Sequence, residues 1–151
     1  MTEGEKELVF DLPVEADHVA RFALAVREDN PVFYDESFAR EHGFPSVLAP
    51  PTFTVTQILQ IPRLEREERL ASGLEYERVL HGEQEFIYKR LPVAGEVLKG
   101  TMRISRDFTK EGKRGGAMRF LTYESVFTDA DGEEVVRGLY TLIETAKDVG
   151  G

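Results

Sequence analysis

The sequence predicts one α+β domain over residues 1–151, in which an antiparallel sheet curls around a buried apolar helix. Three observations support this prediction. The length of 151 residues suits a single domain with a substantial core. The first half of the chain carries apolar residues at helical spacing, and the second half carries four strand-like segments joined by short turns. Strands that follow one another through short turns pair antiparallel, so a preceding apolar helix can fill the curled sheet.

The first half begins with a short strand at residues 8–10. Apolar residues then repeat at helical spacing between residues 15 and 27, which predicts the first helix. Asp35 is a good N-cap for a short second helix, and Gly43 is a good C-terminal stop for it.

The next two segments differ in character. Residues 52–59 follow Pro50-Pro51, and proline is tolerated in the first turn of a helix. This third helix carries few charges, so we expect it to be buried. Residues 63–70 are highly charged and predict a solvated helix, because a coiled-coil arm needs several heptads and the segment holds barely one. Four strands complete the chain, at residues 79–88, 98–108, 117–128 and 135–143.

Composition excludes several functional classes. The chain has no cysteine, so disulfides, thiolate nucleophiles and cysteine metal sites are excluded. Its three histidines, His18, His42 and His81, lack the spacing of a metal motif. The formal charge of −9 opposes binding to nucleic acid or to an anionic membrane. No apolar run is long enough to span a membrane, and we expect a cytoplasmic protein without an export signal.

The most informative segment, residues 28–53, reads EDNPVFYDESFAREHGFPSVLAPPTF. It resembles the active-site segment of the MaoC-like hydratases and dehydratases, which have the hot-dog fold and usually carry D-x-N-P-h-H-x-D. Glu28 stands at the Asp position, Asn30 and Pro31 match, and Phe33 stands at the His position. Residues 80–144 resemble the FAS1-like N-terminal dehydratase branch of that superfamily, through LHGEQEFIYKRLPVAGEVL and FTDADGEEVVRGLYTLIE.

The resemblance implies chemistry that this chain does not fully support. The catalytic members hydrate a trans-2-enoyl thioester with an Asp and a His around one water, and a backbone N–H at the start of the central helix polarises the thioester carbonyl. Phe33 cannot move a proton, and the longer side chain of Glu28 displaces its carboxylate. Pro50-Pro51 lacks N–H groups, so Thr52 or Phe53 is the candidate donor. His81, at the start of the first long strand, is the other titratable candidate for catalysis.

The resemblance therefore implies the acyl-binding subunit of a two-component (3R)-hydroxyacyl-thioester dehydratase, paired with a MaoC-like subunit that carries the Asp and the His. Two alternatives stay open: a non-enzymatic acyl-thioester-binding homodimer, and a self-sufficient hydratase that uses Glu28 or His81. Neither a metal nor another cofactor is expected, because the substrate arrives as a thioester of coenzyme A or of an acyl carrier. The candidate substrate-binding residues, which are otherwise explained as core or packing residues, are Asn30, Phe33, Tyr34, Thr52, Phe53 and Phe86.

Basic residues cluster around the turn between the second and third long strands. Lys110, Lys113 and Arg114 form the centre of this cluster. They are interpreted either as solvated strand ends or as a landing patch for the phosphates of coenzyme A or for an acidic carrier protein.

Overall fold

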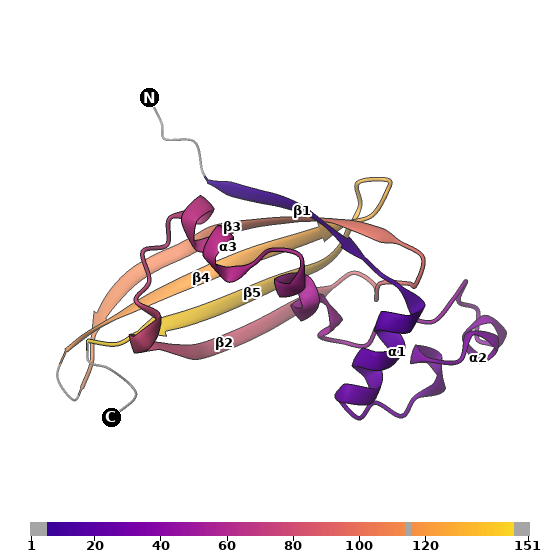
Figure 1. Ribbon diagram of the computed structural model, residues 1–151. Helices are drawn as coiled ribbons and strands as arrows, with labels where there is room; N and C mark the ends of the chain where they lie inside the picture. The colour runs from indigo at the N-terminus through magenta and orange to yellow at the C-terminus, as the bar shows by residue number, and fades with distance from the viewer. Residues whose placement is uncertain (1–5, 114–115, 147–151) are drawn as a thin grey trace.

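A computed structural model describes residues 6–113 and 116–146 and shows a five-stranded sheet (Figure 1). The strands are β1 (Glu7–Pro13), β2 (Val79–Tyr88), β3 (Val97–Glu111), β4 (Ala117–Thr128) and β5 (Glu134–Glu144). They lie in the order β1-β3-β4-β5-β2, and every neighbouring pair is antiparallel. The predicted α+β class and the four consecutive strands are confirmed, and the architecture is the expected hot-dog fold.

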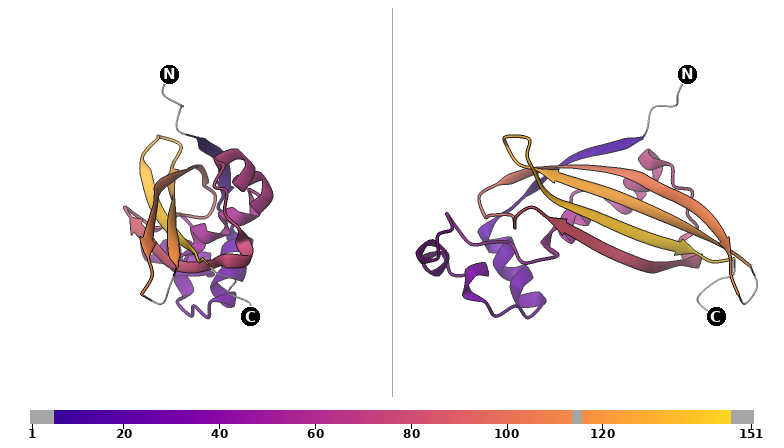
Figure 2. Two further views of the ribbon diagram at one scale, coloured as in Figure 1. Left: turned by 90° about the vertical axis from the view of Figure 1, so that its left-hand side faces the viewer. Right: turned by 180° about the vertical axis from the view of Figure 1, so that it is seen from behind.

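The helical segments occupy two places around the sheet. Figure 1 shows α1 (Ala16–Ala25) and α2 (Glu36–Glu41) gathered beyond one end of the sheet, whereas α3 (Arg63–Leu70) lies across one of its faces. The end-on view in Figure 2 shows the sheet bending around the side on which α3 lies. Three short 3₁₀ segments complete the chain: η1 (Pro31–Phe33), η2 (Phe53–Leu59) and η3 (Tyr76–Arg78).

Local sequence signals explain the turns of the helical lobe formed by α1, η1 and α2. The Asp35 carboxylate accepts a hydrogen bond of 3.0 Å from the Phe38 N–H, which confirms Asp35 as the N-cap of α2. Gly43 follows α2 with φ of +90°, a conformation that glycine adopts without strain. The Asn30 side chain accepts a hydrogen bond of 3.1 Å from the Val32 N–H and so caps η1.

The segment expected as a buried helix differs from the prediction. It forms as the 3₁₀ segment η2, and Thr52 in front of it takes the left-handed conformation with φ of 76°. A 3₁₀ helix repeats every three residues, so Phe53 and Thr56 share one face and Val55 and Ile58 share another. The first face is buried, whereas Val55 is 39% and Ile58 56% exposed. The segment is therefore buried on one side only.

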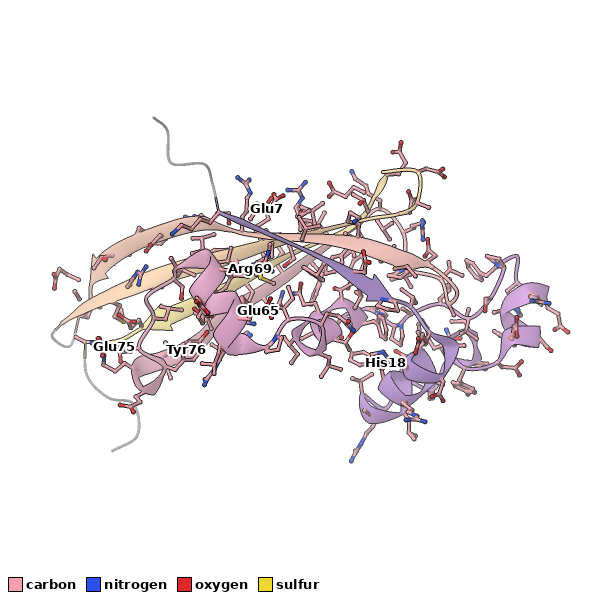
Figure 3. All side chains as sticks on the ribbon, turned by 45° about the horizontal axis from the view of Figure 1, so that its top comes forward. Glu7, His18, Glu65, Arg69, Glu75 and Tyr76 are labelled. Atoms are coloured by element: carbon pink, nitrogen blue, oxygen red, sulfur yellow. The ribbon has the colours of Figure 1, made fainter. Side chains whose placement is uncertain are left out.

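Helix α3 also departs from its prediction as a wholly solvated helix. Its outer face carries an ion pair one helical turn apart, in which Arg69 and Glu65 lie 3.3 Å from each other (Figure 3). Its inner face buries Arg66 and Leu70 against the sheet. A single amphipathic helix of this length covers the sheet and provides no coiled-coil arm.

Glu67 on α3 holds the helix to the sheet through a buried polar network. Its carboxylate accepts hydrogen bonds from the Ser72 hydroxyl, from the Tyr76 hydroxyl at 2.5 Å and from the Tyr123 hydroxyl on β4 at 3.0 Å. The neighbouring Arg66 guanidinium lies 3.2 Å from the same carboxylate. Apolar contacts of Leu70 with Leu121 and Met102 in one core cluster surround the network.

A close contact at the sheet edge provides the first prediction. Phe10 on β1 lies directly opposite Gly100 on β3, its ring lies over that glycine, and it packs edge-on against Phe127 at 5.9 Å. A Cβ at position 100 would overlap the Phe10 ring. Gly100→Ala should lower the free energy of unfolding by about 1–3 kcal/mol in a denaturant titration. The double variant Gly100→Ala/Phe10→Ala should lose less unfolding free energy than the sum of the losses in the two single variants. Strictly additive losses would show that the two residues do not interact.

The buried network predicts a pH dependence of stability. Burial and the hydrogen bond to Glu67 raise the pKa of Tyr76 from its ordinary 10.0 to about 12. Because the folded-state pKa is the higher one, the stabilisation is complete below pH about 10 and is lost as pH rises toward about 12. Thermal denaturation across this range should show a decline in stability, and Tyr76→Phe should reduce the decline. Tyr34→Phe, at an exposed tyrosine, should leave the decline in stability unchanged. An equal decline in both variants would show that the Tyr76–Glu67 hydrogen bond does not cause it.

Candidate functional site

The segment that corresponds to the catalytic motif packs as the interior of the helical lobe. Phe33 is only 6% exposed and lies in a core cluster with Ala23, Ala39 and Leu48. The ring is therefore part of the apolar interior of the lobe, at the position that the sequence resemblance assigns to the His of catalytic members. It leaves no titratable group there.

The other polar groups of this segment make local hydrogen bonds. The Glu28 carboxylate accepts a hydrogen bond of 3.4 Å from the Asn30 N–H, within the turn that follows α1. The exposed Tyr34 donates its hydroxyl to the Asp29 carbonyl at 3.0 Å. These contacts shape the turn, and the roles of Glu28, Asn30 and Tyr34 toward a substrate stay predictions.

The candidate oxyanion donors at the start of η2 are both occupied within the chain. The Thr52 N–H donates to the Tyr88 hydroxyl at 2.8 Å, and the Phe53 N–H donates to the Pro50 carbonyl at 3.0 Å. Burial raises the pKa of Tyr88, so its hydroxyl stays protonated at neutral pH. A thioester carbonyl would have to displace the Tyr88 hydroxyl to reach the Thr52 N–H.

A cavity of about 460 Å³ lies between η2, α3 and one face of the sheet. Val55, Gln57 and Ile58 on η2 form one wall, and Arg63 and Arg66 on α3 form the next. The size of the cavity suits a small organic ligand or an acyl group.

The sheet supplies the opposite wall of the cavity. His81 lies where the register between β2 and β5 shifts, and its ring lies 4.8 Å from that of Tyr140. Tyr123 and Ser125 on β4 and Gln84 on β2 complete the polar part of this wall. Of the predicted site residues within the described part of the chain, His81 alone lines this cavity.

Most of the titratable groups that line the cavity are held in a defined charge state. Burial raises the pKa of Tyr123 and of Tyr140, so both phenols are protonated at neutral pH and can donate hydrogen bonds. Burial alone would lower the pKa of Arg66, but its hydrogen bonds to Tyr76 and Glu67 outweigh this effect and the pKa is raised. The guanidinium, which lies 5.6 Å over the Tyr123 ring, is charged.

The remaining predicted binding residues lie elsewhere. Phe53 is buried in the main core cluster, and Phe86 packs against that cluster. His18 is on α1, where its ring contacts Phe53 at 5.1 Å, at the other end of the molecule from Tyr76 (Figure 3). His42 is exposed and makes a 2.8 Å hydrogen bond between its Nδ1 and the Phe38 carbonyl. Sequence reasoning missed Gln57, Arg63, Arg66, Tyr76 and Tyr140 as residues of the cavity wall.

The predicted basic patch lies at the hairpin of β3 and β4, away from the helical lobe (Figure 1). Lys110 is exposed and lies 5.5 Å from the centre of the Phe108 ring, and Lys113 is exposed. Arg114 lies outside the described residues. Arg119, farther along β4, lies 2.7 Å from Asp107, and the hydrogen bond lowers the pKa of that carboxyl. The carrier-binding role of this patch stays a prediction.

Residues 6–113 and 116–146 lack two further kinds of feature. This part of the chain brings together no group of three His, Asp or Glu side chains that could hold a metal ion. It also contains no helix that is long and apolar enough to cross a membrane.

The chain is similar to known proteins in sequence and in structure. A family model described as "FAS1-like, dehydratase domain region" matches residues 3–137. The UPF0336 protein of Leifsonia xyli subsp. xyli is 35% identical over 137 residues, which cover 86% of this chain and 83% of the relative. The UPF0336 protein of Clavibacter michiganensis is 36% identical over 142 residues, which cover 89% of this chain and 87% of the relative.

Solved structures with the same fold include dehydratases. The HadBC (3R-hydroxyacyl-ACP dehydratase) complex from Mycobacterium tuberculosis contains a chain with a TM-score of 0.75 and 22% identity, over 95% of this chain and 99% of that one. A MaoC-like dehydratase gives a TM-score of 0.78 and 24% identity, over 95% of this chain and 42% of that one. The ChsH1–ChsH2 complex from Mycobacterium tuberculosis contains a chain with a TM-score of 0.72 and 20% identity, over 97% of this chain and 85% of that one. With the match over residues 3–137, the chain belongs to the FAS1-like dehydratase domain family and has the hot-dog fold of MaoC-like proteins.

Proposed function

We propose that this chain is the acyl-thioester-binding subunit of a two-component (3R)-hydroxyacyl-thioester dehydratase, equivalently an (R)-specific enoyl-thioester hydratase. In this proposal a MaoC-like partner supplies the Asp and the His that act on the water, and the present chain binds the acyl group. The observation that carries it is Phe33, a buried ring at the position of the catalytic His. A benzene ring neither accepts nor donates the proton that the reaction must move.

Two observations support assembly with a partner, one from the surface of this chain and one from structurally similar proteins. Val55, Ile58 and Leu59 on η2 are exposed apolar side chains, with Leu59 exposed by 68%. They lie beside the cavity, of which Val55 and Ile58 form part of the wall. Contiguous exposed apolar side chains mark interaction sites more often than free surface. Two of the structurally similar proteins are themselves two-component complexes by name, HadBC and ChsH1–ChsH2.

The division of labour in this proposal follows from the chemistry. Reversible addition of water to a trans-2 double bond needs a positioned acid and base but no redox group and no metal. The thioester handle, from coenzyme A or an acyl carrier, comes with the substrate. The present chain contributes a cavity of about 460 Å³ and excludes bulk water from the acyl group inside it.

A second candidate function has one observation in its favour. His81 lines the cavity next to Tyr140, so a titratable ring and a phenol that is protonated at neutral pH lie side by side. A self-sufficient hydratase would use His81 as its base. His81 is exposed and the part of the chain that the structure describes gives its ring no hydrogen-bond partner that would orient it, so we rank this candidate second.

The two candidates separate in a hydration assay with crotonyl-CoA and longer enoyl-CoA substrates. The purified chain alone should be inactive. Mixed with a MaoC-like protein from the same genome that keeps D-x-N-P-h-H, it should give turnover about a hundredfold or more above either protein alone. Glu28→Gln in this chain should leave the turnover of the mixture unchanged. Turnover by the lone chain that His81→Ala abolishes would favour the second candidate, and thioester binding without turnover in any mixture would favour a non-enzymatic binder.

Replacement of Phe33 tests whether its ring is part of the core. Phe33→His should lower the free energy of unfolding by about 2–4 kcal/mol, because a buried ring is exchanged for a smaller polar one. It should create no hydration activity, since the second half of the motif, at Glu28, is engaged in a turn. Tyr34→His, at the adjacent exposed position, serves as the matched control and should lower the free energy of unfolding by less than about 1 kcal/mol. A stable Phe33→His variant with hydratase activity would contradict this account.

A further inference from the structure

The cavity between η2, α3 and the sheet combines apolar surface with many hydrogen-bonding side chains. Its apolar lining consists of Val55, Ile58, Met102 and Gly138, and the other nine lining residues carry hydrogen-bonding groups. A tunnel for a plain alkyl chain gains its binding energy from apolar surface, because each hydrocarbon group leaves water for an apolar contact. A plain alkyl chain would use the apolar part of this wall but would leave its hydrogen-bonding groups without a partner.

The charges of the cavity wall are opposite to those of the whole chain. The protein carries a formal charge of −9, yet no carboxylate is among the described residues that line the cavity. Arg63 and Arg66 both line it, and the Glu67 carboxylate, which is not part of the lining, lies 3.2 Å from Arg66. The Arg63 guanidinium lies 4.4 Å over the Tyr76 ring, and the described part of the chain gives it no ion-pair partner.

Arg66 has hydrogen-bond donors left over. Its Nε donates to Glu67 at 3.2 Å and its Nη2 to the Tyr76 hydroxyl at 3.3 Å. A guanidinium carries five N–H donors, so the two on Nη1 remain without a partner in the described chain. The residue is only 8% exposed, and the cavity is therefore where a partner for Nη1 would lie.

Other polar groups around the cavity also lack partners. The Gln57 side-chain oxygen is buried and accepts no hydrogen bond from the described residues. The Tyr140 hydroxyl likewise makes none in that part of the chain. A buried polar group without a partner is costly, as at Gln57, and an occupant with hydrogen-bonding atoms would also pair with the Tyr140 hydroxyl.

We propose that the cavity selects acyl groups that carry a carboxylate, over unsubstituted alkyl acyl groups of the same length. This inference rests on the proposed acyl-binding function and names its substrate class. The carboxylate oxygens accept from Arg63, from the free Nη1 of Arg66 and from the Tyr140 hydroxyl, which are the donors that the wall presents. The Gln57 amide turns its N–H group toward the same oxygens, because its two ends are interchangeable by rotation.

The pantetheine arm of coenzyme A is a second source of oxygen acceptors, and the test must separate it from the acyl group. Three ligands serve: adipyl-CoA, hexanoyl-CoA and free coenzyme A. The first two have acyl groups of equal length and differ in the terminal carboxylate. Isothermal titration of the full chain, alone and mixed with its MaoC-like partner, should show adipyl-CoA binding on the order of tenfold more tightly than hexanoyl-CoA. Free coenzyme A should bind more weakly than either.

Variants locate the preference in the cavity. Arg63→Gln and Tyr140→Phe should each weaken the binding of adipyl-CoA more than that of hexanoyl-CoA and so remove most of the preference for adipyl-CoA. Arg69→Gln is the matched control, because Arg69 lies on the same helix and pairs with Glu65 on its outer face. This control should keep the full preference.

Several outcomes would overturn the inference. Hexanoyl-CoA binding as tightly as adipyl-CoA would do so, and so would free coenzyme A binding as tightly as both. Failure of all three ligands to bind the chain or its complex would also overturn it. The readout is binding, so it is independent of turnover: hydratase activity without the carboxylate preference defeats this inference alone, whereas the preference without any turnover defeats the proposed function alone.

Discussion

The docking of η2 and α3 onto the sheet is the constraint on which the rest of the structure depends. Phe53 secures the first segment in the main core, and Glu67 secures the second by accepting hydrogen bonds from hydroxyls on three sides. A carboxylate in such a position is stabilising only if its partners are all present, because a buried charge without them is costly. The same network fixes Arg66 beside the cavity. Stability and the proposed ligand recognition therefore share these residues, and a change in one affects the other.

In the helical lobe, the segment that resembles a catalytic motif keeps its caps and turns, although Phe33 cannot transfer a proton. Asn30 and Asp35 still cap their helical turns, and Gly43 still ends α2. These roles depend on backbone geometry, which is independent of whether a proton is transferred nearby. Phe33 fills the remaining space and adds apolar contacts to the lobe. A buried ring is easily accommodated at this position because the surrounding residues, Ala23 and Leu48 among them, are apolar too.

The sequence was sufficient to predict the strands, both caps of α2 and the position of the first helix, because these depend on local periodicity and turn chemistry. It was less informative for residues 52–70. Apolar content suggested one buried helix, but the 3₁₀ geometry of η2 turns Ile58 outward. High charge suggested a solvated helix, but Arg66 is buried by partners far along the chain, including Tyr123 on β4. The cavity wall combines residues from seven elements, and no local pattern could have grouped Gln57 with Tyr140. His81 was identified only because its ring is titratable.

The central claim is that this chain binds the acyl group while another subunit performs the proton transfers. The most direct measurement is the enoyl-CoA hydration rate of the two-component mixture after the partner alone has lost the Asp and the His of its motif. Our account predicts that turnover falls to the background rate although this chain is intact. Hydration that persists in this mixture at a substantial fraction of the original rate would contradict it, because the acid and base would then have to belong to the present chain.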